Sequence, residues 1–427
     1  MKRTICISFL ALFSASMVMS QVLTPHKYTN PTGHAFPILA WYSILNDDVS
    51  HARLQELADA GFNLSFQIYP NTESLKKALK ASRGTGVKLI TACPQLSNNT
   101  AVTVKALRKD KQNAGYFLID EPSTNHFTEL AAWAQKIRSE DDSRLLYLNL
   151  LPNYATPEQY GTKTYKQYVE RFIREIGLGF VSFDHYPVLS DRDNSYLREG
   201  YYENLEDVSS VCRKAEIPFW GFALATAHGP YPVMTRSMLR LQVFSNLAYG
   251  AQGLQYFTYW TPTPAEQAGL NYRNAPIDNN GKRTEVFDLI KELNAEVRRL
   301  TPVFLGASII DVAHTGKKIP LGTHSPKRLP SAIRNIHSSG EGFIVSYFTN
   351  HNKNYFMVVN RDLHHRQQAH VEAADIVRRI LSDGTSVPAS LYSCNLWLEP
   401  GDYLLYEWQM KRARFSRGAP STYSNNQ

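Results

Sequence analysis

The sequence predicts an α/β protein in which a (β/α)8 TIM barrel is followed by a small antiparallel β-sandwich domain. Three observations support this prediction. Between residues 36 and 305, strand-like and helix-like segments alternate eight times. The strand-like segments are continuous apolar runs, as in parallel sheets that helices cover on both faces. After residue 306, single apolar and polar residues alternate instead, which is typical of antiparallel strands.

Each of the eight units pairs one apolar run with one segment of helical spacing. The strand segments are 36–43, 62–70, 87–94, 113–122, 143–154, 180–188, 217–229 and 253–262. The helix segments are 49–61, 71–84, 100–111, 127–140, 156–177, 194–216, 235–251 and 285–305. Barrels of this type typically have about 250 residues, a length that the eight units match.

Local signals justify the helices as well as the apolar periodicity does. Segment 71–84 begins at Asn71, whose side chain can cap a helix. Segment 156–177 begins with Thr156 followed by Pro157, which is favoured at the first helical position. The helix at 100–111 is the weakest of the set, because its valines and threonines have low helix propensity.

A doubly wound open sheet is the alternative architecture. Such a sheet usually has fewer strands, and its nucleotide-binding form has a glycine-rich turn after the first strand. Here the first strand is followed by ILNDD, which contains no glycine. The barrel is therefore favoured, and neither a nucleotide nor another cofactor is predicted.

The chain divides into four predicted regions. They are a signal peptide at 1–20, the barrel at 21–306, the β-sandwich domain at 307–410 and a disordered basic tail at 411–427. Lys2 and Arg3 precede an apolar stretch that ends in small residues, as in secretory signals. We therefore expect export to the periplasm, the cell surface or the exterior. No later stretch reaches the roughly 18 apolar residues of a membrane span.

The predicted β domain contains five recognisable strands. They read GEGFIVSYFTN, KNYFMVVNRD, QQAHVEAAD, ASLYSCNLWL and GDYLLYEWQ. Each alternates apolar and polar residues, and turns separate them.

Composition excludes several classes of function. The formal net charge of the 427 residues is +8, but part of it lies in the signal peptide and the tail. The remaining charge is dispersed, whereas a nucleic-acid site needs clustered basic residues. Outside the signal peptide, the cysteines are Cys93, Cys212 and Cys394. Their odd number and wide spacing predict buried thiols rather than a disulfide framework or a zinc site. The oligomeric state stays open.

The active site of a parallel barrel lies at the carboxyl ends of its strands. Polar and aromatic residues gather at those ends here. Together they suit a sugar, because rings stack on its apolar face while acids and amides bond its hydroxyls. Asp184, His185 and His228 could form a metal cluster, but their spacing matches no ligand pattern, and no metal is predicted.

Three motifs resemble the clan A glycoside hydrolases. They are IDEP at the end of strand segment four, YFTYW in segment eight and EPGDYLLYEW in the β domain. The fourth strand of that clan ends in Asn-Glu, and the glutamate is the acid/base. The resemblance implies that Glu121 is the acid/base and that Asp120 takes the place of the asparagine. It also implies that Trp260 stacks on the sugar.

The sequence departs from that clan at strand segment seven. The clan has a nucleophilic glutamate there, whereas FWGFALATAHG contains no acid. The best candidate for the second carboxylate is Asp184, at the end of segment six. A separation of about 5–5.5 Å from Glu121 would predict retention, and about 6.5–9.5 Å inversion. Asp120 is the weaker candidate, because neighbouring strand residues point to opposite faces.

The catalytic residues are therefore predicted to be Glu121 and Asp184. The predicted substrate-binding residues are Trp41, Gln67, Tyr69, Asp120, Asn149, His185, Tyr186, His228, Gln255 and Trp260. Aromatic neighbours would strip water from Glu121 and raise its pKa, so that it can donate a proton near neutral pH.

Each of these residues also has a structural interpretation. Glu121 could cap a helix or pair with an arginine, Asp184 could bond turn amides, and the histidines and tryptophans could simply pack. The predicted function is an exported glycoside hydrolase acting on an oligosaccharide or polysaccharide. The alternative is a carbohydrate-binding barrel that has lost catalysis, which the missing acid of strand segment seven favours.

Overall fold

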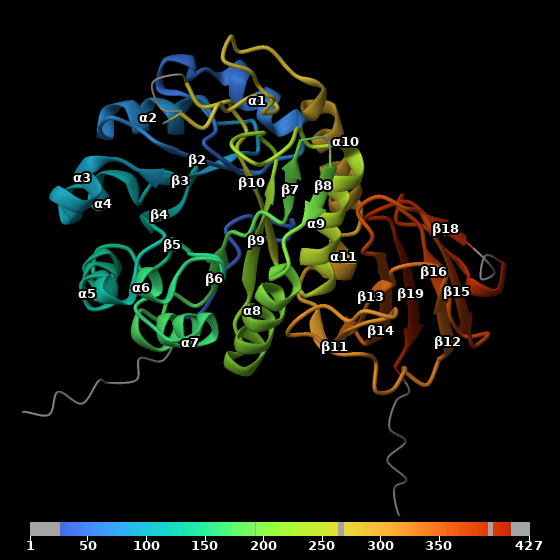
Figure 1. The fold of residues 1–427 in the computed structure, drawn as a ribbon. Coiled ribbons are helices and arrows are strands. Elements are labelled where there is room, and N and C mark those ends of the chain that lie inside the picture. The colour runs from blue at the N-terminus through green and yellow to red at the C-terminus, as the bar shows by residue number, and fades with distance from the viewer. Residues whose placement is uncertain (1–25, 193, 264–268, 392–395, 411–427) are drawn as a thin grey trace, which may run out of the picture.

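The computed structural model describes residues 26–192, 194–263, 269–391 and 396–410 (Figure 1). The signal peptide and the basic tail predicted from the sequence lie outside these residues, as does Cys394. Cys93 and Cys212 are buried free thiols. None of the helices in the described ranges is long and apolar enough to span a membrane.

Eight parallel strands close into the predicted barrel, in the order β1-β10-β9-β6-β5-β4-β3-β2. They are β1 (Ile38–Trp41), β2 (Leu64–Ile68), β3 (Lys88–Ala92), β4 (Asn113–Asp120), β5 (Leu145–Leu150), β6 (Val181–Phe183), β9 (Phe219–Leu224) and β10 (Gly253–Phe257). The predicted fold class is thus confirmed for the barrel.

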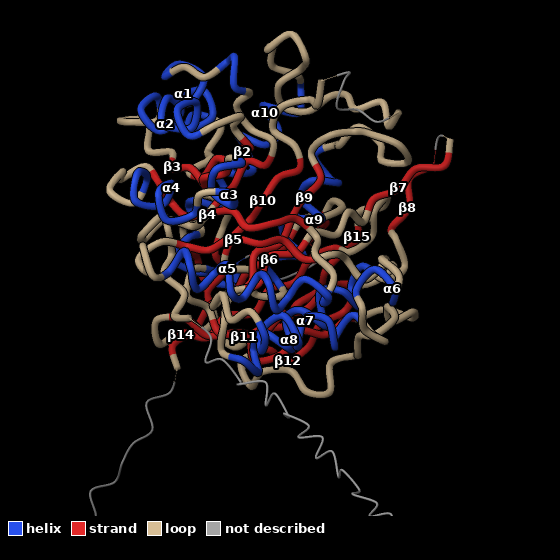
Figure 2. The backbone as a smooth tube through the Cα atoms, turned by 90° about the vertical axis from the view of Figure 1, so that its left-hand side faces the viewer, coloured by secondary structure: helices blue, strands red, loops and turns tan. Residues whose placement is uncertain are grey.

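Helices surround the strands as an outer layer (Figure 2). They are α1 (His51–Asp59), α2 (Thr72–Ala81), α3 (Pro94–Asn98), α4 (Thr100–Leu107), α5 (Phe127–Arg138), α6 (Pro157–Tyr160), α7 (Tyr165–Glu175), α8 (Tyr201–Ala215), α9 (Arg236–Ala248), α10 (Glu285–Arg299) and α11 (Thr301–Phe304). The caps act as the sequence indicates. The side chain of Asn71 accepts from the backbone N–H of Ser74 at 2.9 Å, and Thr156 forms a reciprocal capping box with Gln159.

Aromatic rings fill the upper interior of the barrel. Side chains alternate between the two faces of each strand, so one residue in two points inward. The inward ring of Trp41 lies 4.2 Å from that of Phe66 and 5.4 Å from that of Phe222, measured between ring centroids. Phe117 and Tyr147 complete this layer. The layer forms an apolar floor beneath the carboxyl ends of the strands.

A β-bulge in β4 changes which residues face inward near its end. Phe117 is paired with Tyr147 of β5, but the next recorded pair joins Asp120 to Asn149. β4 therefore advances three residues while β5 advances two, and the extra residue shifts the alternation. As a result Asp120, rather than Ile119, lies beside Asn149.

The segment after β6 differs from the prediction. Residues 194–216 were predicted to be helical throughout, but β8 (Asn194–Leu197) pairs with β7 (Val188–Asp191) as an antiparallel hairpin. The helix α8 begins only at Tyr201. The hairpin pairing overrides the weak helical periodicity of 194–197, whose residues are mostly polar.

The C-terminal residues form two antiparallel sheets, with orders β11-β13-β14-β19-β16-β17 and β12-β15-β18. Their strands are β11 (Ser308–His314), β12 (Ile333–Ser338), β13 (Phe343–Asn350), β14 (Lys353–Asn360), β15 (Gln367–Ala373), β16 (Arg378–Ile380), β17 (Ser386–Pro388), β18 (Leu396–Leu398) and β19 (Tyr403–Gln409). Residues of both sheets share one apolar core, which confirms the sandwich. The sequence analysis did not identify β11, β12, β16 and β17, of which β16 and β17 are very short.

The sandwich packs against the barrel beside α9 and α11, where Figure 1 draws it in orange and red. A buried polar cluster lies in this contact. Arg240 of α9 pairs with Glu296 of α10 at 2.6 Å and with Asp402, just before β19, at 2.5 Å. The hydroxyl of Tyr403 donates to Glu296 at 2.9 Å. The two parts of the chain are thus joined by buried charges as well as by apolar packing.

Candidate active site

A cavity of about 340 Å³ opens at the carboxyl ends of the barrel strands. Its lining comes from five strand ends and from the loops beyond them. The lining residues are Trp41, Asp120, Glu121, Asn149, Tyr154, Asp184, Tyr186, Phe222, His228, Tyr231, Phe257 and Tyr272. Three carboxyl groups, of Asp120, Glu121 and Asp184, therefore face one space whose other walls are largely aromatic.

The backbone turns sharply at Glu121. Its φ of +48° lies in the left-handed region, which non-glycine residues seldom adopt. Its N–H still bonds the carbonyl of Asn149 at 2.9 Å, and the carbonyl of Pro122 accepts from the Tyr168 hydroxyl at 2.6 Å. Because the strand has ended, adjacent side chains no longer alternate. Asp120 and Glu121 both reach the cavity, contrary to the expectation that they point apart.

Asn149 holds the two aspartates of the cavity together. Its Nδ2 donates to Asp120 Oδ1 at 3.2 Å and to Asp184 Oδ1 at 2.9 Å. Its Oδ1 accepts from the Ser182 hydroxyl at 2.9 Å, which fixes the orientation of the amide. Asp184 is only 6% exposed, whereas Asp120 and Glu121 are exposed to the open cavity.

The pKa values of all three carboxyls are raised. Burial among protein atoms raises the pKa of Asp120 to about 7, the charge of Glu121 adds to this, and the bond from Asn149 opposes it. Burial also raises the pKa of Glu121 and, most strongly, that of Asp184. A hydrogen bond between the carboxyls of Glu121 and Asp184 raises the pKa of Asp184 further and opposes the rise in the pKa of Glu121.

Aromatic rings wall the cavity around this cluster. Tyr186 lies 5.4 Å from Phe257 between ring centroids, and Tyr272 stacks on the His228 ring at 4.4 Å. His228 Nδ1 contacts the carbonyl of Thr226 at 3.0 Å, and burial lowers the pKa of the ring. The histidine is therefore neutral near pH 7, with Nδ1–H as donor to the carbonyl and Nε2 left as an acceptor.

Arg198 contacts two of the tyrosines that line the cavity. The guanidinium of Arg198, which follows the β7–β8 hairpin, lies 4.0 Å from the centroid of the Tyr154 ring. Its Nη2 also donates to the Tyr231 hydroxyl at 3.2 Å. The arginine thus ties two lining tyrosines to the hairpin, and the hairpin becomes part of the cavity wall.

The structure brings seven of the predicted site residues together. They are Trp41, Asp120, Glu121, Asn149, Asp184, Tyr186 and His228. Five others do not line the cavity. They are Gln67, Tyr69, His185, Gln255 and Trp260. The prediction that these residues contact the substrate is therefore corrected.

Two of the five corrections concern strand β2 and the residue after it. Phe66 is the inward residue of β2, in contact with Trp41, so Gln67 points to the other face. Tyr69 is 1% exposed, and its hydroxyl bonds the carbonyl of Ile44 at 3.3 Å.

The other three corrections concern residues buried below or beside the cavity. Gln255 is inside the barrel, where its amide bonds Ser182 and the Tyr147 hydroxyl. His185 is 1% exposed and packs its ring between Tyr154 and Tyr201. Trp260 is also 1% exposed and packs beneath Arg53, so the ring that meets the cavity from this part of the chain is Phe257 instead.

The end of β9 contributes no acid to the cavity. Thr226, which the sequence places near the missing nucleophile, is fully buried and bonded to Thr258 at 2.7 Å. Within the described part of the chain, no three Asp, Glu, His or Cys side chains are arranged to hold a metal ion.

Sequence reasoning missed five lining residues, namely Tyr154, Phe222, Tyr231, Phe257 and Tyr272. Phe222 and Phe257 could have been found from strand alternation, since each occupies a position whose side chain points into the barrel. Tyr154, Tyr231 and Tyr272 lie on loops, where no periodicity indicates the direction of a side chain.

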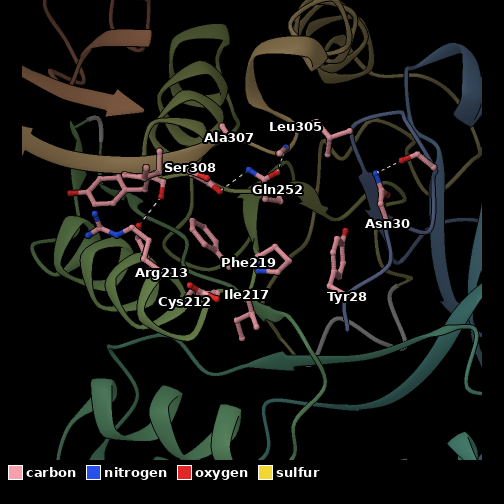
Figure 3. Close-up of a pocket in the computed structure, with 18 residues that line it drawn as sticks. Tyr28, Asn30, Cys212, Arg213, Ile217, Phe219, Gln252, Leu305, Ala307 and Ser308 are labelled. Atoms are coloured by element: carbon pink, nitrogen blue, oxygen red, sulfur yellow. Dashed lines mark hydrogen bonds between the residues drawn. The ribbon is translucent and has the colours of Figure 1, made fainter. Parts of the chain in front are cut away.

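A second and larger cavity, of about 680 Å³, lies at the opposite end of the barrel (Figure 3). Its walls include Tyr28, Phe219 at the start of β9, and Gln252 just before β10. These positions are at the amino ends of the strands, where conservation of barrel residues serves stability rather than chemistry. Glu216 is the one carboxylate in its lining. The smaller cavity is therefore the candidate active site.

Comparison with known proteins confirms the fold that the motif resemblance implies. No family model and no curated protein matches the sequence. Among solved structures, a family 39 glycoside hydrolase from Bacteroides cellulosilyticus is similar, with a TM-score of 0.53 and 10% identity over 90% of this chain and 82% of that one. An α-amylase from Geobacillus thermoleovorans, complexed with acarbose, has a TM-score of 0.51 and 11% identity over 90% and 100% of the two chains.

Proposed function

We propose that the protein is an exported glycoside hydrolase that cleaves glycosidic bonds of an oligosaccharide or polysaccharide. The observation that carries this proposal is the cluster of Asp120, Glu121 and Asp184 in an aromatic-walled cavity at the carboxyl end of the barrel. The two similar solved structures are a glycoside hydrolase and an α-amylase, which supports the same class of reaction.

Glu121 is the proposed general acid. Its carboxyl is exposed to the cavity, and burial raises its pKa, which favours the protonated form that a general acid needs. Asp184 is buried beside it, and burial together with the nearby acids raises the pKa of Asp184. Trp41, Tyr186 and the other rings offer apolar faces on which a sugar ring stacks.

Hydrolysis of a glycan panel tests the proposal. Wild-type protein should release reducing sugar, and Glu121→Gln should lower kcat by about 10²–10⁴-fold, the usual contribution of a general acid. Glu129→Gln, at an exposed position of α5, is the matched control and should retain activity. Activity that survives Glu121→Gln would remove Glu121 from this role.

The second candidate is a carbohydrate-binding barrel without catalysis. The observation that favours it is the end of β9, where Thr226 is bonded to Thr258 and no acid is present. Glycan binding by calorimetry, with no product released by wild-type protein, would select this candidate.

Export is part of the proposal. The apolar stretch after Lys2 and Arg3 supports removal of residues 1–20 as a signal peptide. The proposed domains of the remaining chain are the barrel at 21–306, the sandwich at 307–410 and a tail at 411–427. N-terminal sequencing of the mature protein in the exported fraction checks this, and an intact Met1 would contradict it.

A further inference from the structure

Glu121 and Asp184, the two carboxyls expected to act as acid and nucleophile, are too close together to flank a glycosidic bond. Retaining enzymes with two carboxylates hold them about 5–5.5 Å apart, and inverting enzymes about 6.5–9.5 Å apart. Here Glu121 and Asp184 share a hydrogen bond, and Asp184 and Asp120 accept from the same nitrogen of Asn149. The three acids therefore form one contiguous cluster in the cavity. The separation expected from the sequence is not found for the pair of Glu121 and Asp184.

The tyrosines and the histidine of the lining are poor replacements for the missing nucleophile. Burial raises the pKa values of the Tyr154, Tyr186 and Tyr272 hydroxyls, which makes their ionised forms still scarcer at neutral pH. His228 is neutral, but its ring is stacked flat on Tyr272 at an interplanar angle of 17°. A nucleophile supplied by the substrate itself would need none of these groups.

We propose that the site acts on β-linked N-acetylhexosamine residues, and that the acetamido carbonyl oxygen of the substrate is the nucleophile. This inference rests on the proposed glycosidase function and names its substrate class. The reaction needs one acid for the leaving group, one carboxylate for the amide N–H and an apolar surface for the methyl group. The cavity contains all three.

Asp120 suits the amide N–H. Its side chain is exposed to the cavity, and Asn149 donates to only one of its oxygens, so the other can accept a further hydrogen bond. Asp184 is less suited, because it is buried and already bonded to both Asn149 and Glu121. The apolar surface is formed by Trp41 and Phe222, which contact each other and line the same cavity as the carboxyls.

The step balances without any further reactant. The carbonyl oxygen forms a bond to the anomeric carbon as the glycosidic C–O bond breaks, and the leaving oxygen takes the proton of Glu121. Asp120 accepts the amide proton as the five-membered oxazoline ring closes. Water then attacks the same carbon and gives a proton to Glu121, while the bond from that carbon to the oxazoline oxygen breaks. Asp120 returns its proton to the nitrogen, which restores the acetamide. Attack from within the sugar requires the leaving group on the opposite face, so β-linkages are cleaved with retention.

Matched aryl glycosides test the inference. The pairs are 4-nitrophenyl β-glycosides with either 2-acetamido or 2-hydroxyl groups, in gluco and galacto configuration, as mono- and disaccharides. We expect kcat/KM to be at least about 100-fold higher for the acetamido member, the loss that follows removal of one strongly stabilising group from a transition state. Replacing acetamido by trifluoroacetamido should lower kcat further, because its carbonyl is a weaker nucleophile.

Variants separate this role of Asp120 from a structural one. Asp120→Asn should lower kcat on the acetamido substrates by about 10²-fold and should steepen the loss on trifluoroacetamido substrates. Asp375→Asn, at an exposed position of the sandwich, should change neither. Equal turnover of the hydroxyl glycosides would overturn the inference and leave the glycosidase function standing. Absence of turnover on every glycoside, in the panel above as well, would overturn both.

Discussion

At the scale of single residues, the amide of Asn149 determines how the carboxyls of the cavity are arranged. Ser182 fixes its orientation, and its nitrogen then draws Asp120 and Asp184 together. Because the charges of these acids repel one another and protein atoms surround them, neutral forms are favoured. The sequence predicted the presence of these acids at strand ends, but their mutual contact depends on hydrogen bonds that no spacing reveals.

The raised pKa of Asp184 leads to a prediction about how the stability of the fold depends on pH. A carboxyl whose pKa is higher in the folded state contributes stability below its unfolded pKa, about 3.9, and loses it as pH rises through the folded pKa. The asparagine in Asp184→Asn cannot ionise, and its side-chain oxygen can still accept the hydrogen bond from Asn149. Its Tm should therefore exceed that of wild type by about 3 °C or more at pH 8, and by less at pH 5.

Thermal unfolding at the two pH values measures this difference. Asp375→Asn, at an exposed position of the sandwich, is the control and should show the same small difference at both. The prediction is wrong if the Tm difference between Asp184→Asn and wild type is smaller at pH 8 than at pH 5. That result would mean that ionising Asp184 costs the folded protein little stability.

At the scale of the element, the end of β4 carries the chemistry because the strand is irregular there. The bulge between Phe117 and Asp120 moves Asp120 to the inner face, and the left-handed turn at Glu121 sends the next side chain to the same cavity. Strict strand alternation predicts the opposite for this pair. The sequence IDEP places two acids at a strand end, but it does not specify a bulge.

Gly115 makes the close approach of β4 and β5 possible. A Cβ at this position would lie 2.3 Å from the backbone oxygen of Leu145, which cannot move without moving β5. Gly115→Ala should therefore destabilise the fold by about 1–3 kcal/mol, the usual cost of overpacking, and should lower kcat because Asp120 and Asn149 shift apart. Denaturant unfolding and kinetics measure both effects, and an unchanged midpoint would contradict the stated contact.

Regular elements were predictable and loops were not. The eight parallel strands follow from apolar runs, and the helix caps at Asn71 and Thr156 follow from residue type. The β7–β8 hairpin and the loop residues Tyr231 and Tyr272 do not, since their positions depend on tertiary contacts such as the Arg198 bond to Tyr231. The cavity walls were therefore only partly predicted.

At the scale of the whole molecule, the barrel and the sandwich share a buried ionic cluster. Arg240 is 8% exposed and Glu296 6% exposed, and Asp402 joins them from the sandwich. Phe244 of α9 also packs on Tyr403 at 4.3 Å between ring centroids. Apolar residues of both parts belong to one continuous core. We therefore expect the two parts to stabilise each other.

Arg240→Met tests this coupling. It leaves the buried Glu296 and the half-buried Asp402 without their cation and should lower the free energy of unfolding by about 3–5 kcal/mol. Arg236→Met, on the same helix, removes an exposed pair with Glu292 and should cost less than about 1 kcal/mol. Calorimetry compares the two variants, and equal small losses would show that the cluster contributes little to joining the two parts.

A crystal structure of the Glu121→Gln variant with a bound oligosaccharide tests the central claim most directly. We predict a sugar ring in the cavity above Trp41 and Phe222, with its glycosidic oxygen about 3 Å from the side chain of residue 121. A sugar bound only elsewhere, such as at the amino ends of the strands near Gln252 or on the exposed ring of Trp397, would contradict the proposed active site.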